Sequence, residues 1–511
     1  MKKRIVIIGA GPAGLTAAYE LSKHPNYSVT VLEADAVAGG ISRTVLTGNN
    51  RMDLGGHRFF SKDKRVQQWW FDLFPAQGKP SLDDKLLGRT AALSAGGPDP
   101  EEQDHVFLMR KRISRIYYRH TFFNYPLSLS LQTLWNLGVW NLCKAGCSYL
   151  VCCVHKRPET SLENFYINRF GKTLYQMFFE GYTEKLWGRH PRDISADWGA
   201  QRVKGLSVRA VLKDLLQRLT HQKNKKVETS LIEEFYYPKY GPGQLWTAVA
   251  DLVQKQGGTV KWNSPVTGLE QDGKRITAVY CGNEKIEADI VLSSMPIKDL
   301  IAALPQTPQP LQQIAQQLPY RDFVTVGLLV DKLALPNKTN IPTFQNTIPD
   351  CWIYVQDTGV KMGRIQIFNN WSPYMVQDCQ HTVWMGLEYF CDEGDDFWNM
   401  PEEKCIELAK TELKKIGFIT DKTHILHAHR ERVKKAYPAY FDSYGQIGQV
   451  VDYLNGLDNL YCIGRNGQHR YNNMDHSMLT AFETVRHILT GEGSKQAIWN
   501  VNTEKEYHEQ R

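Results

Sequence analysis

The strongest constraint on the fold is a glycine motif that begins at the ninth residue. Residues 4–8 form an apolar run typical of a buried strand, and residues 12–23 are rich in Ala and Leu, which favours a helix. Between them lies the segment GAGPAG, which fits the pattern G-x-G-x-x-G. Glycines in this context permit a tight turn, approach of the backbone to a pyrophosphate, and close packing of helix on strand. We therefore predict a βαβ dinucleotide-binding unit whose contacts are Gly9, Gly11, Pro12, Ala13 and Gly14.

An acidic residue and a second pair of glycines extend this motif. Glu33 ends the second expected strand, residues 28–33, where a carboxylate accepts hydrogen bonds from a ribose and disfavours the 2′-phosphate of NADP. Gly39, Gly40 and Arg43 follow in an arrangement that resembles the extended motif of FAD enzymes of the amine-oxidase superfamily. The sequence has no second G-x-G-x-x-G, so no separate NADPH domain is expected. These features favour FAD as the cofactor and an external reductant such as NAD(P)H.

Length, charge and cysteine content narrow the class further. A chain of 511 residues is too long for one core, so two or three domains are expected. The net charge of +7 suits phosphate ligands, but no stripe of Lys and Arg indicates nucleic acid. The ten cysteines form no C-x-x-C pair, and no metal site is expected. The N-terminus continues directly into the glycine motif and does not resemble a signal peptide, so a cytoplasmic location is expected.

One segment is apolar enough to imitate a membrane span. It covers residues 129–155, but Asn136, Asn141 and Lys144 interrupt it, and its polar residues recur at helical spacing. This pattern favours an amphipathic helix over a transmembrane span, and it leaves peripheral contact with a membrane surface open.

The order of expected elements predicts an α/β fold with a discontinuous nucleotide domain. Residues 127–225 look mostly helical, strands return after residue 227, and a β-rich region covers about 320–395. We expect a Rossmann-like FAD-binding domain, a helical insert domain and an antiparallel β-sheet substrate domain. The predicted boundaries are 1–110, 227–305 and 431–511 for the FAD-binding domain, 111–226 for the helical domain, and 306–430 for the sheet domain.

Beyond residue 50 the chain resembles the UDP-galactopyranose mutases, and the long eukaryotic ones more than the short bacterial ones. Residues 75–160 match poorly. The matching segments follow the order of that family: DLGGHRFFS (53–61), YTEKLWGRHPRDISADWGAQRV (182–203), YPKYGPGQLW (237–246), CWIYVQDTGVKMGRIQIFNNWSPY (351–374), AYPAYF (436–441) and GRNGQHRYNNMDHSM (464–478). The resemblance implies interconversion of the pyranose and furanose forms of a sugar nucleotide, with N5 of reduced FAD as the nucleophile on the anomeric carbon. It also implies a role in the biosynthesis of cell-surface polysaccharides.

The resemblance assigns further residues to the cofactor. His57 follows Gly55 and Gly56, and it matches a histidine beside the isoalloxazine ring that responds to the redox state of the flavin. A helix is expected to begin near residue 475 and to direct its N-terminus at the flavin pyrimidine, where negative charge develops on reduction. The residues assigned to the flavin are Gly56, His57, Gly464, Arg465, Asn473, Met474 and Asp475, although Asp475 could equally serve as a helix cap.

Two arginines are assigned to the substrate diphosphate by the same resemblance. Arg202 lies 15 residues after Trp187, and Arg364 lies in the segment GRIQIFNN. A guanidinium suits phosphate because its planar fork offers two donors and stays charged. For each arginine the alternative is an ordinary ion pair. Together with His57, these arginines are the predicted catalytic residues.

Four aromatic residues complete the predicted substrate site. Tyr437 and Tyr471 match tyrosines whose hydroxyls reach the diphosphate, and Tyr182 and Trp187 match aromatic residues on the nucleotide side. Packing in the core is the alternative for each of them.

A second function stays open beside the mutase. It is a FAD-dependent oxidoreductase of the amine-oxidase or protoporphyrinogen-oxidase group, for which the apolar segment at 129–155 could serve at a membrane surface. A non-catalytic scaffold that holds FAD is disfavoured because His57 and both arginines are present. The residues leave the sugar, the nucleotide, the physiological reductant and the oligomeric state open.

Overall fold

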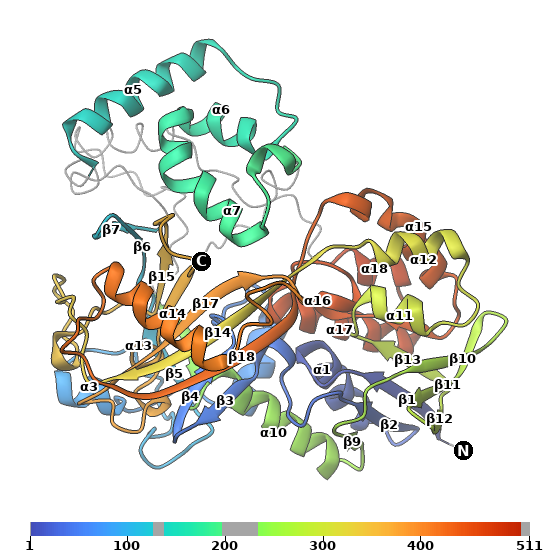
Figure 1. Ribbon diagram of the computed structural model, residues 1–511. Coiled ribbons are helices and arrows are strands. Elements are labelled where there is room, and N and C mark those ends of the chain that lie inside the picture. The colour runs from blue at the N-terminus through green and yellow to red at the C-terminus, as the bar shows by residue number, and fades with distance from the viewer. Residues whose placement is uncertain (1, 126–136, 197–233, 502–511) are drawn as a thin grey trace, which may run out of the picture. The chain divides into compact units, whose positions relative to one another are not determined.

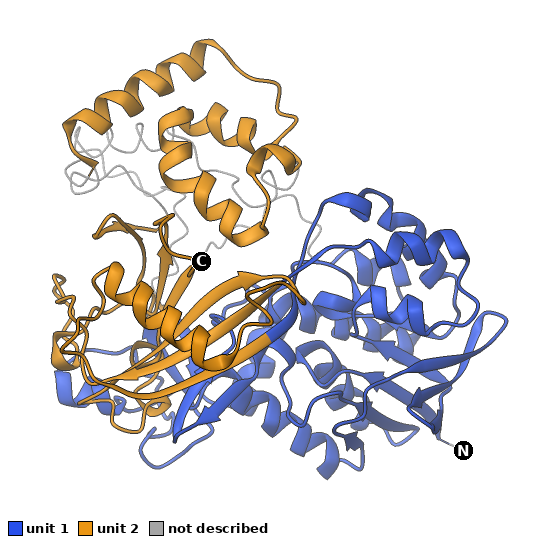
Figure 2. Cartoon of the chain, viewed as in Figure 1, with its two compact units in different colours: residues 1–110, 235–321, 433–504 blue, residues 111–234, 322–432, 505–511 orange. Residues whose placement is uncertain are grey.

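The computed structural model describes residues 2–125, 137–196 and 234–501, and it divides the chain into two compact units. Unit 1 comprises residues 1–110, 235–321 and 433–504, and unit 2 comprises residues 111–234, 322–432 and 505–511 (Figure 2). Most of the predicted helical domain (111–226) and sheet domain (306–430) belongs to unit 2, but residues 306–321 belong to unit 1, and the division into three domains stays a prediction. The predicted catalytic residue Arg202 lies outside the described residues.

Unit 1 is built on a five-stranded parallel sheet with the order β19-β13-β1-β2-β9 (Figure 1). Strand β1 alternates its side chains between two cores, because Ile5 and Ile7 face one cluster whereas Val6 and Ile8 face another. Helices α1, α10 and α17 cover the first face, and α11, α12 and α15 cover the second. The bounds are β1 Lys3–Ile8, β2 Tyr27–Leu32, β9 Thr259–Lys261, β13 Ile290–Ser293, β19 Leu460–Cys462, α1 Pro12–Ser22, α10 Pro242–Lys255, α17 Met474–Thr490, α11 Ile297–Ala303, α12 Gln309–Gln316 and α15 Ile447–Asn455.

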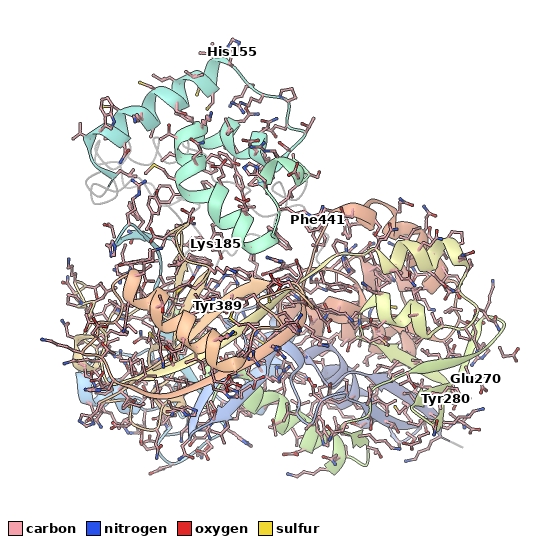
Figure 3. The ribbon with its side chains drawn as sticks, in the orientation of Figure 1. His155, Lys185, Glu270, Tyr280, Tyr389 and Phe441 are labelled. Atoms are coloured by element: carbon pink, nitrogen blue, oxygen red, sulfur yellow. The ribbon has the colours of Figure 1, made fainter. Side chains whose placement is uncertain are left out.

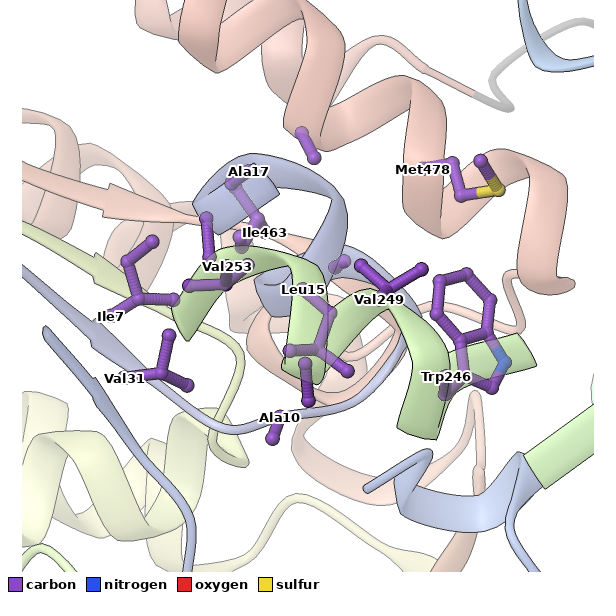
Figure 4. Close-up of a cluster of buried hydrophobic side chains, with 14 of the residues drawn as sticks. Ile7, Ala10, Leu15, Ala17, Val31, Trp246, Val249, Val253, Ile463 and Met478 are labelled. Carbon is purple, nitrogen blue, oxygen red and sulfur yellow. The ribbon is translucent and has the colours of Figure 1, made fainter. Parts of the chain in front are cut away.

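The first core contains the packing of helix on strand that the glycine motif predicts (Figure 4). Leu15 of α1, Trp246 of α10 and Met478 of α17 are all buried there. A Cβ atom added to Gly14 would lie 1.9 Å from the carbonyl oxygen of Gly9, so no larger residue fits between α1 and the turn. The expected elements at residues 4–8, 12–23 and 28–33 are all present to within one residue at each end.

Smaller elements complete unit 1. A hairpin after Gly39-Gly40 forms from β3 and β4, and three antiparallel strands, β10 to β12, lie on the second core. The remaining bounds are η1 Gly40–Ser42, β3 Thr44–Thr47, β4 Asn50–Asp53, α2 Lys64–Leu73, α3 Leu82–Leu87, β5 Phe107–Lys111, β8 Glu234–Pro238, β10 Gly268–Asp272, β11 Arg275–Cys281, β12 Glu284–Glu287, η6 Asp442–Gln446, α16 Gly464–Gly467 and α18 Lys495–Trp499.

Unit 2 contains a seven-stranded sheet with the order β18-β14-β17-β16-β15-β6-β7. One face packs on α14 through an apolar core that includes Val326, Leu387 and Ile365 of the sheet and Leu413 of the helix. The bounds are β6 Ser114–Tyr118, β7 Thr121–Asn124, β14 Tyr320–Val330, η4 Phe344–Asn346, β15 Trp352–Val355, β16 Arg364–Ile367, α13 Phe368–Trp371, η5 Pro373–Met375, β17 Val383–Cys391, α14 Glu402–Lys415 and β18 Ile425–Pro438. The same alternation that builds this core turns Arg364 and Glu388 to the opposite face.

Helices form the rest of unit 2. Their bounds are α5 Val139–Val154, α6 Leu162–Tyr175, the π-helix η2 Gln176–Glu180, α7 Gly181–Trp187 and η3 Pro191–Asp193. Helix α5 is the described part of the apolar segment at 129–155, and it packs along α6. Within the described ranges, no helix combines the length and the apolar character that a crossing of the bilayer needs.

We predict that Gly14→Ala removes FAD and lowers the melting temperature by roughly 5 °C or more, because its Cβ would overlap the backbone of Gly9. Gly146→Ala in α5 is the matched control, since a Cβ there meets no atom within 4 Å and alanine favours a helix by up to about 1 kcal/mol. Thermal unfolding and flavin content are the measurements. A Gly14→Ala protein that melts and binds flavin like the wild type would contradict this packing.

Candidate functional site

The glycine turn leaves the N-terminus of α1 open for an anion. Gly9 has a φ of +99°, a left-handed conformation that favours glycine. Gly11 is the N-cap of α1, and no described side chain accepts a hydrogen bond from the N–H groups of the first helical turn. A Cβ on Gly11 would lie 3.9 Å from the Cα of Gly40, so the second glycine pair faces the first motif across a narrow gap. This cradle of backbone donors suits a pyrophosphate.

Glu33 stands at the carboxyl end of β2, where a ribose is expected. Its carboxylate accepts hydrogen bonds from the backbone N–H of Ala10 at 2.6 Å and of Asp35 at 2.9 Å. Burial raises the pKa of this carboxyl group, and the two backbone donors act in the opposite direction. The side chain of Arg43 donates to the carbonyl of Gly40 at 3.1 Å, so it holds the second glycine pair in place.

The C-terminal segment lies against the first motif, although more than 400 residues separate them. A Cβ on Gly464 would lie 2.8 Å from the Cβ of Ala13, and the N–H of Gly464 donates to the Thr480 hydroxyl at 2.8 Å. Gly467 approaches the carbonyl of Ser293 at the end of β13 in the same way. The fold therefore brings the predicted segment at 464–475 to the carboxyl edge of the parallel sheet, next to the glycine turn.

Helix α17 begins at Met474, and Asn473 caps it. The Asn473 side chain accepts from the backbone N–H of His476, whose ring in turn accepts from the backbone N–H of Asn473. Asp475 is therefore in the first turn of the helix and is not its cap. Burial raises the pKa of its carboxyl group, and the hydroxyl of Ser61 lies close enough to bond it.

His57 is a half-buried, neutral imidazole on the segment that follows β4. Its Nε2 lies 2.9 Å from the carbonyl oxygen of Leu54, which makes this nitrogen the donor. Burial lowers the pKa of His57 to about 4, and the positive charge of Arg465 acts in the same direction. The predicted flavin residues His57 and Arg465 are thus neighbours in unit 1.

Arg465 lies against the two predicted tyrosines. Its guanidinium carbon stands 3.9 Å from the ring centre of Tyr471 and 5.4 Å from that of Tyr437, and the two rings stack at 5.7 Å. Its Nε donates to the carbonyl of Ala436 and its Nη1 to that of Asn472. Among the described carboxylates, none forms an ion pair with this guanidinium. The positive charge is therefore oriented by neutral groups and suits an anionic ligand.

In unit 2, a row of side chains crosses the face of the sheet opposite α14. Tyr354, Arg364, Glu388 and Thr325 stand directly opposite one another on the adjacent strands β15, β16, β17 and β14. Nη1 of Arg364 lies 3.2 Å from the fully buried carboxylate of Glu388, whose pKa burial raises. The ion pair that was the alternative for Arg364 is therefore present, and its contact with a diphosphate stays a prediction.

The predicted nucleotide-side aromatics lie on α7. The hydroxyl of Tyr182 accepts a hydrogen bond from Nε of Arg364 at 2.7 Å, and its ring meets that of Tyr354 edge-on. Trp187 ends the helix and is buried. The structure thus brings Tyr182 and Arg364 together within unit 2, whereas Trp187 is a core residue at the foot of the same helix.

Two polar residues with shifted pKa values were not among the predicted site residues. Buried Asp53 accepts hydrogen bonds from the hydroxyls of Tyr237 and Thr44, and burial raises its pKa to about 7. The partly buried Lys185 on α7 donates to one backbone carbonyl of β15 and to two in the turn before β16, and burial lowers its pKa to about 8 (Figure 3). Both lie in segments that carry the family resemblance, and this resemblance is the one sequence feature that could have drawn attention to them.

No group of His, Cys, Asp and Glu side chains within the described ranges is arranged to hold a metal ion. The site is instead organised around a parallel sheet, a glycine turn at the end of β1, an open helix N-terminus and a buried acid after β2. These features define a dinucleotide-binding protein of the Rossmann class.

Comparison with known proteins gives the family. The profile of NAD(P)-binding Rossmann-like domains matches residues 7–73, and that of flavin-containing amine oxidoreductases matches residues 78–457. The chain belongs to the flavin-containing amine oxidoreductase family. A flavin held by a dinucleotide fold is FAD, so the expected cofactor is confirmed, and the open glycine cradle and Glu33 fit it.

Two solved structures share the fold along nearly the whole chain. Reduced UDP-galactopyranose mutase superposes with a TM-score of 0.76 at 19% identity and covers 99% of this chain and 100% of its own. A candidate protoporphyrinogen oxidase from Exiguobacterium sp. 255-15 superposes with a TM-score of 0.65 at 15% identity and covers 96% of this chain and 100% of its own. The expected α/β fold class and the mutase-like architecture are therefore confirmed.

Among curated proteins, phytoene dehydrogenase from Streptomyces griseus is 24% identical over 343 residues, which are 60% of this chain and 58% of that enzyme. The chain spans less than two thirds of the length of the first curated relatives that it matches. The family profile over residues 78–457, rather than this partial match, identifies the protein as a flavin-dependent enzyme of the amine oxidase superfamily.

We predict that stability depends on pH through His57. The unfolded residue binds a proton near its ordinary pKa of 6.5 and the folded one only near 4, so its contribution to stability is complete above pH 6.5 and is lost as the pH falls toward 4. His57→Asn should therefore destabilise the protein less at pH 5 than at pH 8, as measured by thermal unfolding.

His429→Asn is the control of opposite sign. Its partner Glu431 raises the pKa of His429, so the stabilisation from this residue is present at low pH and is lost as the pH rises through the folded pKa. His429→Asn should therefore cost more at pH 5 than at pH 8. A His57→Asn protein that follows the same trend as the control would contradict a neutral His57.

Proposed function

We propose that the chain is a FAD-dependent sugar-nucleotide mutase, similar to UDP-galactopyranose mutase, that interconverts pyranose and furanose forms. The observation that carries the proposal is the guanidinium of Arg465, which lies over two tyrosines without a carboxylate partner among the described residues. A charge left in this state favours an anionic ligand, and a nucleotide-diphosphate sugar presents one. When bound and reduced, FAD supplies N5 as a nucleophile for the anomeric carbon of the sugar.

Residues of the chain bind the diphosphate and set the charge around the flavin. Arg465, Tyr437 and Tyr471 in unit 1 offer a cation and two hydroxyls to the phosphate oxygens that gain charge as the nucleotide leaves. His57 stays neutral, so it adds no charge of its own beside the flavin ring. From the family resemblance we assign Arg202 to the diphosphate together with Arg364; the resemblance placed Arg465 at the flavin, and we extend its role to the diphosphate because of its contacts with the two tyrosines.

Unit 2 presents a second oriented cation. Glu388 and the Tyr182 hydroxyl hold the Arg364 guanidinium in one orientation, which favours directional hydrogen bonds to a phosphate. Tyr182 accepts the N–H of Arg364 and burial raises its pKa, so its own proton stays available as a donor. We propose that Tyr182 faces the nucleotide, whereas the buried Trp187, which the resemblance also assigned to the nucleotide side, supports the helix that carries Tyr182.

Similarity to reduced UDP-galactopyranose mutase over both whole chains supports the proposal. We further propose a cytoplasmic enzyme that receives electrons from an external reductant such as NAD(P)H and supplies a sugar nucleotide to cell-surface polysaccharide biosynthesis. The second candidate is an oxidoreductase of the amine-oxidase or protoporphyrinogen-oxidase group. The family profile and the match to phytoene dehydrogenase favour it, but an amine or apolar substrate gains nothing from the Arg465 guanidinium, which has no carboxylate partner among the residues that the structure describes.

Turnover distinguishes the two candidates. We predict that dithionite-reduced holoenzyme converts UDP-galactofuranose to UDP-galactopyranose without net oxidation, because a nucleophilic flavin must carry its electron pair. Oxidised holoenzyme should be inactive. Chromatography of the sugar nucleotides measures the conversion. Equal conversion by oxidised enzyme in air, with release of peroxide, would contradict the mutase and favour the oxidoreductase.

We predict that Arg364→Ala weakens UDP binding roughly a hundredfold while flavin content stays unchanged, because a charged donor to the diphosphate is lost. Arg115→Ala is the matched control. Arg115 also pairs with a buried carboxylate, that of Asp350, on the same sheet and also lies over an aromatic ring. Both variants leave a buried acid without its arginine, so both should lower the melting temperature. Equal loss of UDP affinity in both would show that Arg364 acts only on stability.

A further inference from the structure

Helix α5 packs on the rest of unit 2 through small and polar side chains. Ala145 and Cys152 are its buried residues, and the hydroxyl of Ser148 accepts a hydrogen bond from the backbone N–H of Thr173 at 3.1 Å. A Cβ on Gly171 would lie within about 3 Å of the α5 backbone, so this glycine allows α6 to approach α5 closely. Leu142 and Tyr149 are half-buried on the same side, so the larger part of the apolar surface of α5 does not face α6.

In Figure 1, α6 lies along one side of α5. The side chains on the opposite face of α5 are apolar and exposed. Trp140, Leu150 and Val154 are 72%, 66% and 84% exposed, and Val139 and Val151 are 79% and 66% exposed. Spacings of three and four residues place Trp140, Cys143, Cys147, Leu150, Val151 and Val154 on one stripe, which we call the α5 stripe. A surface helix normally turns its apolar stripe toward the core, and α5 does the reverse.

The sequence that contains the α5 stripe carries cations and no acids. No Asp or Glu occurs in the sequence from His105 to Pro158. Lys144 lies within the stripe, with its ammonium group 5.1 Å from the ring centre of Trp140. His155 and Arg157 are exposed at the C-terminal end of the helix (Figure 3). An apolar stripe with cationic flanks complements a surface that is apolar within and anionic outside.

We propose that α5 binds in the plane of an anionic lipid membrane, with the α5 stripe in the boundary between headgroups and acyl chains. The helix of 16 residues is about 24 Å long, shorter than the roughly 30 Å hydrocarbon core, and Lys144 interrupts it. It therefore lies on the membrane rather than across it. Trp140 suits the interface because its indole combines an apolar ring with a polar N–H, and Lys144 and Arg157 meet lipid phosphates.

The charge distribution favours lipid over a second copy of the chain. Pairing two α5 stripes would bring Lys144 and Arg157 of both copies together, and the nearest acid in the sequence, Glu159, already pairs with Arg169. An anionic lipid surface neutralises these same charges. The proposal does not depend on the sugar-nucleotide activity.

The test is co-sedimentation of FAD-loaded protein with vesicles of phosphatidylcholine that contain about one third phosphatidylglycerol. The triple variant Trp140→Ser, Leu150→Ser, Val154→Ser should bind at least about tenfold more weakly than the wild type. Leu46→Ser with Leu426→Ser is the matched control, because these leucines are 62% and 53% exposed and lie outside α5. The control should bind like the wild type, and flavin content confirms that each variant is folded.

Arg157→Gln tests the electrostatic contribution to vesicle binding. It should bind these vesicles about fivefold more weakly and bind pure phosphatidylcholine like the wild type. Equal binding of the triple variant and its control would overturn the proposal, as would binding that does not depend on phosphatidylglycerol. Sedimentation velocity without lipid supplies one more decisive outcome: a dimer of the wild type that the triple variant abolishes would assign the α5 stripe to self-association and overturn the lipid proposal.

Discussion

The contact between α1 and the turn after β1 is the constraint on which the cofactor side of this protein depends. Gly14 places the helix so close to Gly9 that even one methyl group is excluded. This approach directs the uncapped N-terminus of α1 at the edge of the sheet where β1, β2, β13 and β19 end. Gly464 and Gly467, near the C-terminal end of the chain, also allow a close approach of backbone to this turn and to the end of β13. They therefore bring Arg465 to the same edge of the sheet. Backbone sterics thus decide where the charged groups stand.

In the sheet of unit 2, the alternation of side chains along each strand determines which residues face the core and which face the other side. Each central strand gives one set of residues to the apolar core over α14 and the alternate set to the other face. Arg364 and Glu388 occupy that second face, and their mutual pairing allows two buried charges to persist there. The consequence for function is that Arg364 has a fixed direction but a compensated charge, whereas Arg465 has tyrosine neighbours and pairs with no acid in the described part of the chain. We therefore regard Arg465 as the stronger anion site.

The sequence predicted best the features that local sterics determine. The strands and helix around the glycine motif were placed within one residue because a strand, a glycine turn and an Ala-rich helix each leave a local signature. The N-cap was harder, because Asn473 and Asp475 are both good caps and only the bond to His476 decides between them. The residue types alone do not decide between these two caps, because the choice depends on the side-chain geometry in the folded helix.

The site was predicted less completely, because its contacts are non-local. The resemblance named Arg364 and Tyr182, but Glu388 was missed since it reaches Arg364 only through the pairing of β16 with β17. Lys185 was missed for the same reason, as its carbonyl partners come from β15 and the turn before β16. The position of Arg465 over Tyr471 follows from the return of the chain to the first sheet.

We propose that this FAD enzyme holds a nucleotide diphosphate beside its flavin, and titration of UDP into the purified holoenzyme tests this proposal. We expect UDP to perturb the flavin absorbance spectrum saturably, and more strongly than uridine does, because the diphosphate is the group that the cations bind. A flavin spectrum that is indifferent to UDP in both the oxidised and the reduced protein would contradict it.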